Sequence, residues 1–175
     1  MKRLLLILPT LALLRALQAA PSPNLENTPH RFEVTAMHGR AAPALDLSGW
    51  INSAPLPLTE LRGKIVVLDF WATHCRACLS SVPSKNELSQ RLKDQGVVII
   101  GVCLRDGGER MQQMVEKHGI LYPVALDAKG WTARRFHVDS YPDYYVIDRE
   151  GRLRWGDIDN RDLEKAVRIL LDEPN

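Results

Sequence analysis

Hydrophobic side chains form two continuous runs in the middle of the chain. Residues 64–70 and 97–103 consist mostly of Val, Ile and Leu, and Asp69 is the one acidic residue within them. Short apolar runs of this kind are typical of strands that are buried on both faces, as in parallel sheets. The pattern therefore predicts two central strands.

Apolar residues spaced three and four positions apart predict helices after these strands. The segment 75–95 carries its apolar side chains on one side, and Pro83 is expected to kink it near its first turns. A second helix is predicted around residues 111–118. The apolar positions within 163–170 predict a C-terminal helix, with Asn160 as its N-cap.

Two further short runs predict a β-hairpin. Residues 144–147 and 153–155 are apolar or aromatic at most positions, and the turn residues 148–151 separate them. The resulting order is strand, helix, strand, helix, hairpin, helix. This order predicts an α/β fold class with a mixed sheet.

The segments before this pattern have a different composition. In residues 1–20, basic residues precede an apolar stretch and small residues precede Pro21, as in a secretory signal peptide. An uncleaved N-terminal anchor is the alternative, although the stretch is shorter than the roughly 20 residues of a membrane span. Residues 21–42, interrupted by prolines, are predicted to be a linker or loosely packed lead-in. Residues 43–175 form the predicted domain.

Composition and charge exclude some partners. Apolar residues make up 45% of the chain and charged residues 25%, which is typical of a soluble globular domain. Three of the 23 basic residues lie within residues 1–20, so the remainder has 20 basic against 21 acidic side chains. A nearly neutral domain gives no reason to expect a nucleic acid or an anionic membrane as a partner.

Three cysteines add candidate chemistry. Cys75 and Cys78 have C-x-x-C spacing, which in an exported chain suggests redox chemistry rather than a structural framework. Cys103 is predicted to be a buried core cysteine. A structural zinc site would need four ligands, and only Cys103 and scattered histidines remain to supply them.

The predicted position of the cysteine pair assigns different chemistry to its two members. Cys75 would lie at a helix N-terminus beside Arg76, and both features are expected to lower its pKa below the free value of about 8.5. Cys75 is therefore the predicted attacking thiolate. Cys78, one helical turn further on, is the predicted resolving cysteine that closes the disulfide.

The segment 69–78, with sequence DFWATHCRAC, resembles the active-site region of thioredoxin-fold oxidoreductases, and most closely the exported TlpA/ResA-like branch. The resemblance extends over about residues 44–171 and includes Pro83, the tripeptide 140–142 and the turn 147–151. It implies a thioredoxin-like fold, with a central mixed β-sheet flanked by helices. The implied activity is that of a protein-disulfide reductase.

The resemblance also assigns roles to residues. It implies that Asp69 accepts a proton from the resolving cysteine, and burial in an apolar strand suits a carboxyl group to proton transfer near neutral pH. It implies a cis Tyr141–Pro142 bond that forms the wall opposite Cys75. The predicted catalytic residues are Cys75, Cys78, Asp69 and Pro142. The predicted substrate-binding residues are Trp71, His74, Arg76 and Tyr141.

These assignments require no cofactor and no metal. The expected partners are proteins that carry disulfides, together with a membrane thiol transporter as electron donor, and the chain is expected to be a monomer. Its expected location is the periplasm or another extracytoplasmic space, with the N-terminal segment as a tether if it is not cleaved.

Two alternatives stay open at this point. A thiol peroxidase would carry Thr three residues before the reactive cysteine, where this chain has Ala72. A copper-binding module could use the two thiolates, with His137 near the Pro142 loop as a third ligand.

Overall fold

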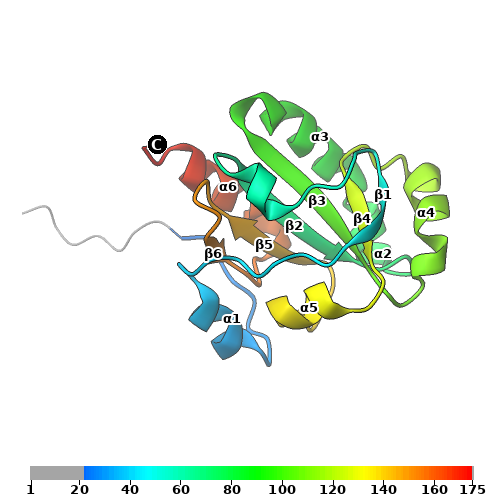
Figure 1. The fold of residues 1–175 in the computed structure, drawn as a ribbon, viewed down its shortest axis with the longest axis horizontal. Coiled ribbons are helices and arrows are strands. Elements are labelled where there is room, and N and C mark those ends of the chain that lie inside the picture. The colour runs from blue at the N-terminus through cyan, green and yellow to red at the C-terminus, as the bar shows by residue number, and fades with distance from the viewer. Residues whose placement is uncertain (1–21, 175) are drawn as a thin grey trace, which may run out of the picture.

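The computed structural model describes residues 22–174, and the predicted signal peptide lies outside these residues. The centre of the fold is a six-stranded sheet in the order β1-β4-β3-β2-β5-β6 (Figure 1). Strands β2, β3 and β4 run parallel, whereas β1, β5 and β6 pair antiparallel with their neighbours. The strands are β1 (Ser48–Ile51), β2 (Ile65–Trp71), β3 (Val97–Leu104), β4 (Val124–Asp127), β5 (Asp143–Ile147) and β6 (Leu153–Trp155).

Helices cover both faces of this sheet (Figure 1). One hydrophobic core contains side chains of α2, α3, α4 and α6, and the second core, on the other face, contains side chains of α1 and α5. The α-helices are α1 (Arg31–Met37), α2 (Arg76–Ser80), α3 (Val82–Leu92), α4 (Met111–His118), α5 (Trp131–Phe136) and α6 (Leu163–Leu171). Short 3-10 helices lie at Leu58–Leu61, Lys93–Gln95, Gly108–Arg110 and Asn160–Asp162.

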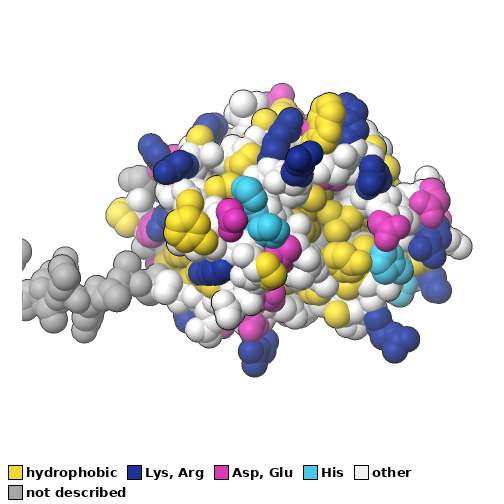
Figure 2. All heavy atoms as spheres, turned by 90° about the horizontal axis from the view of Figure 1, so that it is seen from below, with side chains coloured by type: hydrophobic (Ala, Val, Ile, Leu, Met, Phe, Trp, Pro, Cys, Tyr) yellow, Lys and Arg dark blue, Asp and Glu magenta, His cyan; other side chains and the backbone are white. Residues whose placement is uncertain are grey.

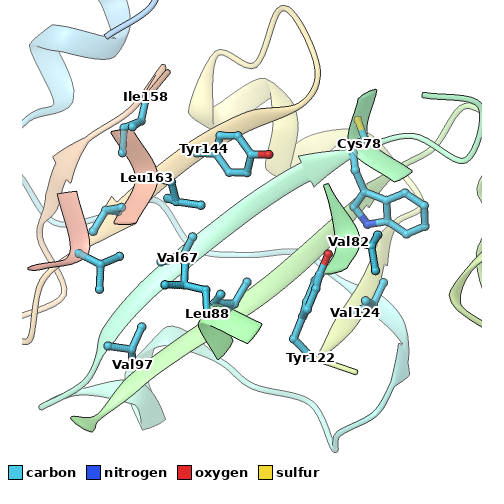
Figure 3. Close-up of a cluster of buried hydrophobic side chains, with 14 of the residues drawn as sticks. Val67, Cys78, Val82, Leu88, Val97, Tyr122, Val124, Tyr144, Ile158 and Leu163 are labelled. Carbon is cyan, nitrogen blue, oxygen red and sulfur yellow. The ribbon is translucent and has the colours of Figure 1, made fainter. Parts of the chain in front are cut away.

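Strand β2 connects the two cores. Every residue of β2 is buried, and its side chains alternate between the faces. Val67 and Trp71 belong to the core under α3 and α6, and Leu68 and Phe70 to the core under α1 and α5. Figure 3 shows the first of these cores, which contains both Val67 of β2 and Leu88 of α3. A continuous apolar run is therefore what this central position requires.

The predicted α/β fold with a mixed sheet is confirmed. Both central strands and the hairpin lie where the hydrophobic runs place them. The single helix expected over 75–95 is instead two helices, because α2 ends before Ser81 and α3 begins at Val82. Pro83 lies in the first turn of α3, where a missing backbone N–H breaks no helical hydrogen bond.

The predicted N-cap at Asn160 is wrong. Asn160 begins a 3-10 helix, and the cap of that helix is Asp159, whose side chain accepts a hydrogen bond from the backbone N–H of Arg161. Helix α6 itself starts after Asp162. The 3-10 helix Asn160–Asp162 therefore precedes α6, which begins at Leu163, three residues after the predicted cap.

The described part of the lead-in, residues 22–42, is more ordered than its proline content indicates. It contains α1, whose Val34 is completely buried in the core that includes β2 and β5. Isolated bridges join Leu25 to Ile158 and Ala41 to Arg152. The lead-in therefore packs along β6 as part of the domain.

The surface has a mixed character. Figure 2 shows one face, on which basic, acidic and histidine side chains interrupt the hydrophobic surface. Within residues 22–174, no helix is both long enough and apolar enough to cross a bilayer.

Candidate active site

Cys75 and Cys78 form a disulfide at the C-terminal end of β2. Their Cα atoms are 5.3 Å apart, and the S–S distance is 2.04 Å. Cys75 is the N-cap of α2, and its Sγ accepts a hydrogen bond of 3.0 Å from the backbone N–H of Cys78. Cys75 is 7% exposed and Cys78 1%. Cys75 is thus the more exposed residue of the pair, and its sulfur already has a backbone N–H donor.

The segment Tyr141–Pro142 lies against Cys75. The peptide bond between these residues is cis, which confirms the expectation from the sequence. The carbonyl oxygen of Tyr141 is 3.9 Å from Cys75 Sγ. The loop before β5 therefore forms one wall of the site.

His74 and Tyr141 connect the two loops around the disulfide. The Nε2 of His74 is 2.9 Å from the Tyr141 hydroxyl, and the two rings meet edge to face at 5.7 Å. Asp106, from the loop after β3, approaches the same imidazole nitrogen at 3.9 Å. Tyr141 is 41% exposed, so its ring is available to a partner beside the disulfide.

An open hollow of about 390 Å³ lies beside the outer turn of α2. Its charged and titratable lining side chains are basic or imidazole groups. The lining residues are His74, Arg76, Leu79, Ser80 and His118. Two of the predicted substrate-binding residues, His74 and Arg76, therefore share one surface with His118, which sequence analysis did not single out.

Trp71 lies elsewhere than expected for a substrate-binding residue. It is 2% exposed and belongs to the core below the site. The register of β2 and β3 places it opposite Cys103. Trp71 therefore supports the loop that carries the cysteines from beneath and does not form part of the surface.

Cys103 is a buried core residue, as predicted. It is completely buried on β3, and burial raises the pKa of its thiol to about 12. A thiol with such a pKa is almost entirely protonated at neutral pH, so it is a poor nucleophile.

Asp69 is fully buried on β2, on the face of the sheet that also packs against Cys78. The Nζ atom of Lys85 donates to its Oδ2 at 2.6 Å, and the Tyr122 hydroxyl donates to the same oxygen at 3.1 Å. Within the described part of the chain, Oδ1 has no hydrogen-bond partner. One oxygen of the Asp69 carboxyl group thus has two hydrogen-bond donors, one of them the ion-pair partner Lys85, and the other oxygen has none within the described residues.

Sequence analysis missed Lys85, although a signal exists. Lys85 lies on α3 between Val82 and Leu88, within the buried stripe of the helix, and is 3% exposed. A lysine at an apolar position of a helix needs a buried partner. Asp69 lies in an apolar strand, as the sequence indicates, and the structure adds a cation that faces it.

Aromatic rings enclose this ion pair. Lys85 Nζ lies 6.0 Å from the ring centre of Tyr122 and 5.7 Å from that of Tyr144. Burial, followed by the negative charge of Asp69, raises the pKa of the Tyr122 hydroxyl above its ordinary value. Figure 3 shows Tyr122 and Tyr144 in the same core as Cys78. The Asp69–Lys85 ion pair thus lies within the hydrophobic core that also contains Cys78.

The described residues contain no group of three or more His, Cys, Asp or Glu side chains arranged to hold a metal ion. His137, which the copper interpretation offers as a third ligand, lies with its ring 6.1 Å from that of His30. The cysteine pair is present as a disulfide instead.

Fold and site together define the class of protein: a thioredoxin-like domain with a thiol–disulfide oxidoreductase site. Residues 38–156 match the AhpC/TSA family, and the chain belongs to this family.

Individual relatives agree with this class. The chain is 34% identical over 146 residues to Protein DipZ of Mycobacterium bovis, an alignment that covers 77% of this chain and 21% of DipZ. It is 28% identical over 116 residues to the thiol-disulfide oxidoreductase ResA of Geobacillus kaustophilus, covering 65% of this chain and 67% of ResA. The chain therefore corresponds to about a fifth of DipZ and to two thirds of ResA.

A solved structure shows the same architecture. The fold is similar to that of a thiol:disulfide interchange protein, DsbE, from Chlorobium tepidum, with a TM-score of 0.69 and 28% sequence identity. The similarity covers 77% of this chain and 97% of the DsbE chain. The part of this chain that carries the site thus corresponds to nearly the whole DsbE chain.

Proposed function

We propose that this chain is an exported thiol–disulfide oxidoreductase that reduces disulfides in proteins. The observation that carries the proposal is the Cys75–Cys78 disulfide, in which the outer sulfur accepts the backbone N–H of Cys78. After reduction, the same N–H would stabilise negative charge on Cys75 and favour its thiolate. Cys75 is the proposed nucleophile for this reason and because it is the more exposed of the pair.

The reaction exchanges one disulfide for another. The Cys75 thiolate attacks a substrate disulfide, forms a mixed disulfide and releases one substrate sulfur as a thiolate, which takes up a proton. Cys78 then loses its proton and attacks the Cys75 sulfur, so that the second substrate thiol leaves. The enzyme dithiol is oxidised, and the substrate disulfide is reduced by the same two electrons.

Asp69 is the proposed acceptor of the Cys78 proton. Both residues lie on one face of the sheet, and Oδ1 of Asp69 is free of other partners within the described residues. Lys85 compensates the carboxylate charge through Oδ2. The pair would thus keep a base in the core next to the resolving cysteine.

The substrate is proposed to bind as an extended segment along Tyr141 and Pro142. The Tyr141 carbonyl lies beside Cys75, where a substrate backbone N–H could reach it. His74 and Arg76 would contact substrate side chains at the adjoining hollow. Trp71 contributes by supporting this surface from the core.

The cellular setting is part of the proposal. The signal-like residues 1–20 support an extracytoplasmic location, such as the periplasm, with this segment either removed or kept as a tether. A membrane thiol transporter is the proposed electron donor, because an exported dithiol must be reduced again after each turnover.

The proposed division of roles can be tested with two serine variants. Cys75→Ser is expected to abolish disulfide reduction, whereas Cys78→Ser should accumulate mixed disulfides through Cys75, because no resolving thiol remains. Mass spectrometry of trapped adducts would identify the linked cysteine. Cys103→Ser is the matched control and should keep wild-type activity. Adducts on Cys78 of the Cys75→Ser variant, formed at the wild-type rate, would reverse the assignment.

The direction of electron flow follows from the reduction potential. We expect a value near that of thioredoxin, about −270 mV, for the Cys75–Cys78 couple. Equilibration with glutathione buffers measures it. A value near about −120 mV would show a strong oxidant and contradict the reductase proposal.

A further inference from the structure

A second buried carboxylate lies behind the substrate-binding wall. Asp143 follows Pro142 directly, begins β5 and is 1% exposed. Its Oδ2 is 3.2 Å from the Tyr145 hydroxyl, and its Oδ1 has no partner among residues 22–174. Alternation along β5 places it on the face of α1 and α5, opposite the face of Asp69. It is therefore separate from the Asp69–Lys85 pair.

The Tyr145 hydroxyl joins Asp143 to another buried carboxylate. It lies 3.3 Å from Oδ1 of Asp157, which is also 1% exposed. The other oxygen of Asp157 accepts a hydrogen bond of 2.9 Å from the Thr28 hydroxyl and has the Arg31 guanidinium at 3.9 Å. Asp157 therefore has a donor and a cation in addition to Tyr145.

Asp143, Tyr145 and Asp157 form a row of three contacting groups. The number of protons they share determines how many of the two carboxyl groups can be ionised. A tyrosine hydroxyl has one proton to donate, so it can serve only one of two ionised carboxylates. If one carboxyl group is protonated, it donates to the hydroxyl, and both contacts become hydrogen bonds. Asp157 has Thr28 and Arg31 to stabilise its negative charge, and so the proton belongs on Asp143.

The groups around Asp143 favour the same assignment. Besides Tyr145 and Asp157, they are Glu26 from the N-terminal segment and Asp139 from the preceding loop, both acidic. Burial, followed by the charge of Asp157, raises the pKa of Asp143 to about 8. The cation of this cluster, Arg31, contacts Asp157 instead.

Asp143 is mechanically connected to the redox site. Its backbone pairs with Phe70 of β2, and two residues before it the Tyr141 carbonyl lies against Cys75. A new negative charge at Asp143 would repel Asp157 inside the core and move the first residue of β5. Pro142 and Tyr141 would move with it.

We propose that Asp143 is a positioning residue of the redox site, whose neutral carboxyl holds the Tyr141–Pro142 wall in place and whose loss of its proton weakens the binding of protein substrates. The proposal rests on the proposed function and adds to it a pH-dependent control of substrate docking. It assigns a role to an acid that takes no part in thiol chemistry.

The test is the pH dependence of KM for insulin as a disulfide-containing protein, measured from pH 6 to pH 9.5. Wild-type KM is expected to rise at least threefold between pH 7 and pH 9, relative to that of Asp143→Asn. Asn stays neutral and can still donate to Tyr145, so its KM should stay at the neutral-pH value. Asp143→Ala lacks the donor, and its KM should be high at every pH. Asp94→Asn, an exposed change in the 3-10 helix Lys93–Gln95 away from the groups around Asp143, is the matched control and should keep the wild-type profile.

Two further measurements separate this proposal from the proposed function. A small aromatic disulfide does not need the extended wall, so its KM should be equal for wild type and Asp143→Asn at each pH. The ¹³C shift of the Asp143 carboxyl, followed by NMR in the wild-type protein, should titrate above pH 7. Titration near pH 4, or identical KM profiles for wild type and Asp143→Asn, would overturn the proposal even if Cys75 proves to be the nucleophile.

Discussion

Lys85→Met is expected to lower the free energy of unfolding by about 3–5 kcal/mol, the usual effect of removing one partner of a buried ion pair. The side chains of Lys85 and Asp69 are 4% and 0% exposed, and their charged atoms are 2.6 Å apart. Methionine fills a similar volume, so packing changes little. The loss arises because Asp69 would be left buried without its cation, with the Tyr122 hydroxyl as its remaining donor. Urea unfolding of the oxidised protein at pH 7 measures the change.

Two controls make this expectation specific to the ion pair. Lys93→Met replaces an exposed lysine just after α3 and should change the free energy of unfolding by less than about 0.5 kcal/mol. Combining Lys85→Met with Asp69→Leu removes both charges and should recover most of the loss. A single variant as stable as the wild type would show that the pair contributes no stability.

The parts of the fold that the sequence predicts have a local signal. Strands β2 and β3 are continuous apolar runs, and the β5–β6 hairpin combines two short runs with a turn. Strands β1 and β4 have four residues each, Ser48–Ile51 and Val124–Asp127, which is too few for a periodic pattern. They become strands by pairing with each other and, for β4, with β3. Their positions depend on tertiary contacts.

The candidate site likewise contains residues that the sequence identifies and contacts that only the folded structure shows. Cys75, Cys78 and Pro142 belong to a recognisable motif, and the structure brings Cys75 next to the Tyr141–Pro142 segment. The contact of Lys85 with Asp69 depends instead on how α3 packs on the sheet. Composition and spacing identify a buried lysine as unusual, but they do not identify its partner.

The same limit applies to the chain of groups behind the site. Asp143 and Tyr145 are two residues apart on one strand, so alternation predicts that they share a face. Asp157 reaches them from beyond β6, with a left-handed backbone conformation at φ 53°. A non-glycine residue rarely takes this conformation, and no pattern in the sequence marks it.

The two buried acids near the site differ in their compensation. Asp69 has a cation at hydrogen-bond distance, whereas Asp143 has a hydroxyl and, beyond it, a second carboxylate. A buried charge is stable only with a partner, and a buried acid without one keeps its proton. Asp69 therefore has a buried cation as its partner, whereas Asp143 is suited to remain neutral.

This difference leads to an expected gain in stability for Asp143→Asn that grows with pH. The folded protein keeps the Asp143 proton up to its raised pKa of about 8, whereas an unfolded aspartate releases it near about pH 3.9. The stabilising contribution is thus complete below about pH 4 and is lost as pH rises to about 8. Each pH unit in this window removes about 1.4 kcal/mol, or on the order of 5 kcal/mol in total, from the wild type alone.

Urea unfolding of the oxidised proteins at pH 4, 6 and 8 measures this gain directly. At pH 4 the two proteins should be nearly equal, because the asparagine amide can replace the carboxyl proton as the donor to Tyr145. At pH 8 the variant should be the more stable by several kcal/mol. Asp94→Asn, an exposed change in the 3-10 helix Lys93–Gln95, should show a small difference that hardly varies with pH. If the difference between Asp143→Asn and wild type is the same at pH 4 and pH 8, Asp143 does not hold a proton in the folded protein, because linkage requires a slope wherever the two states bind different numbers of protons.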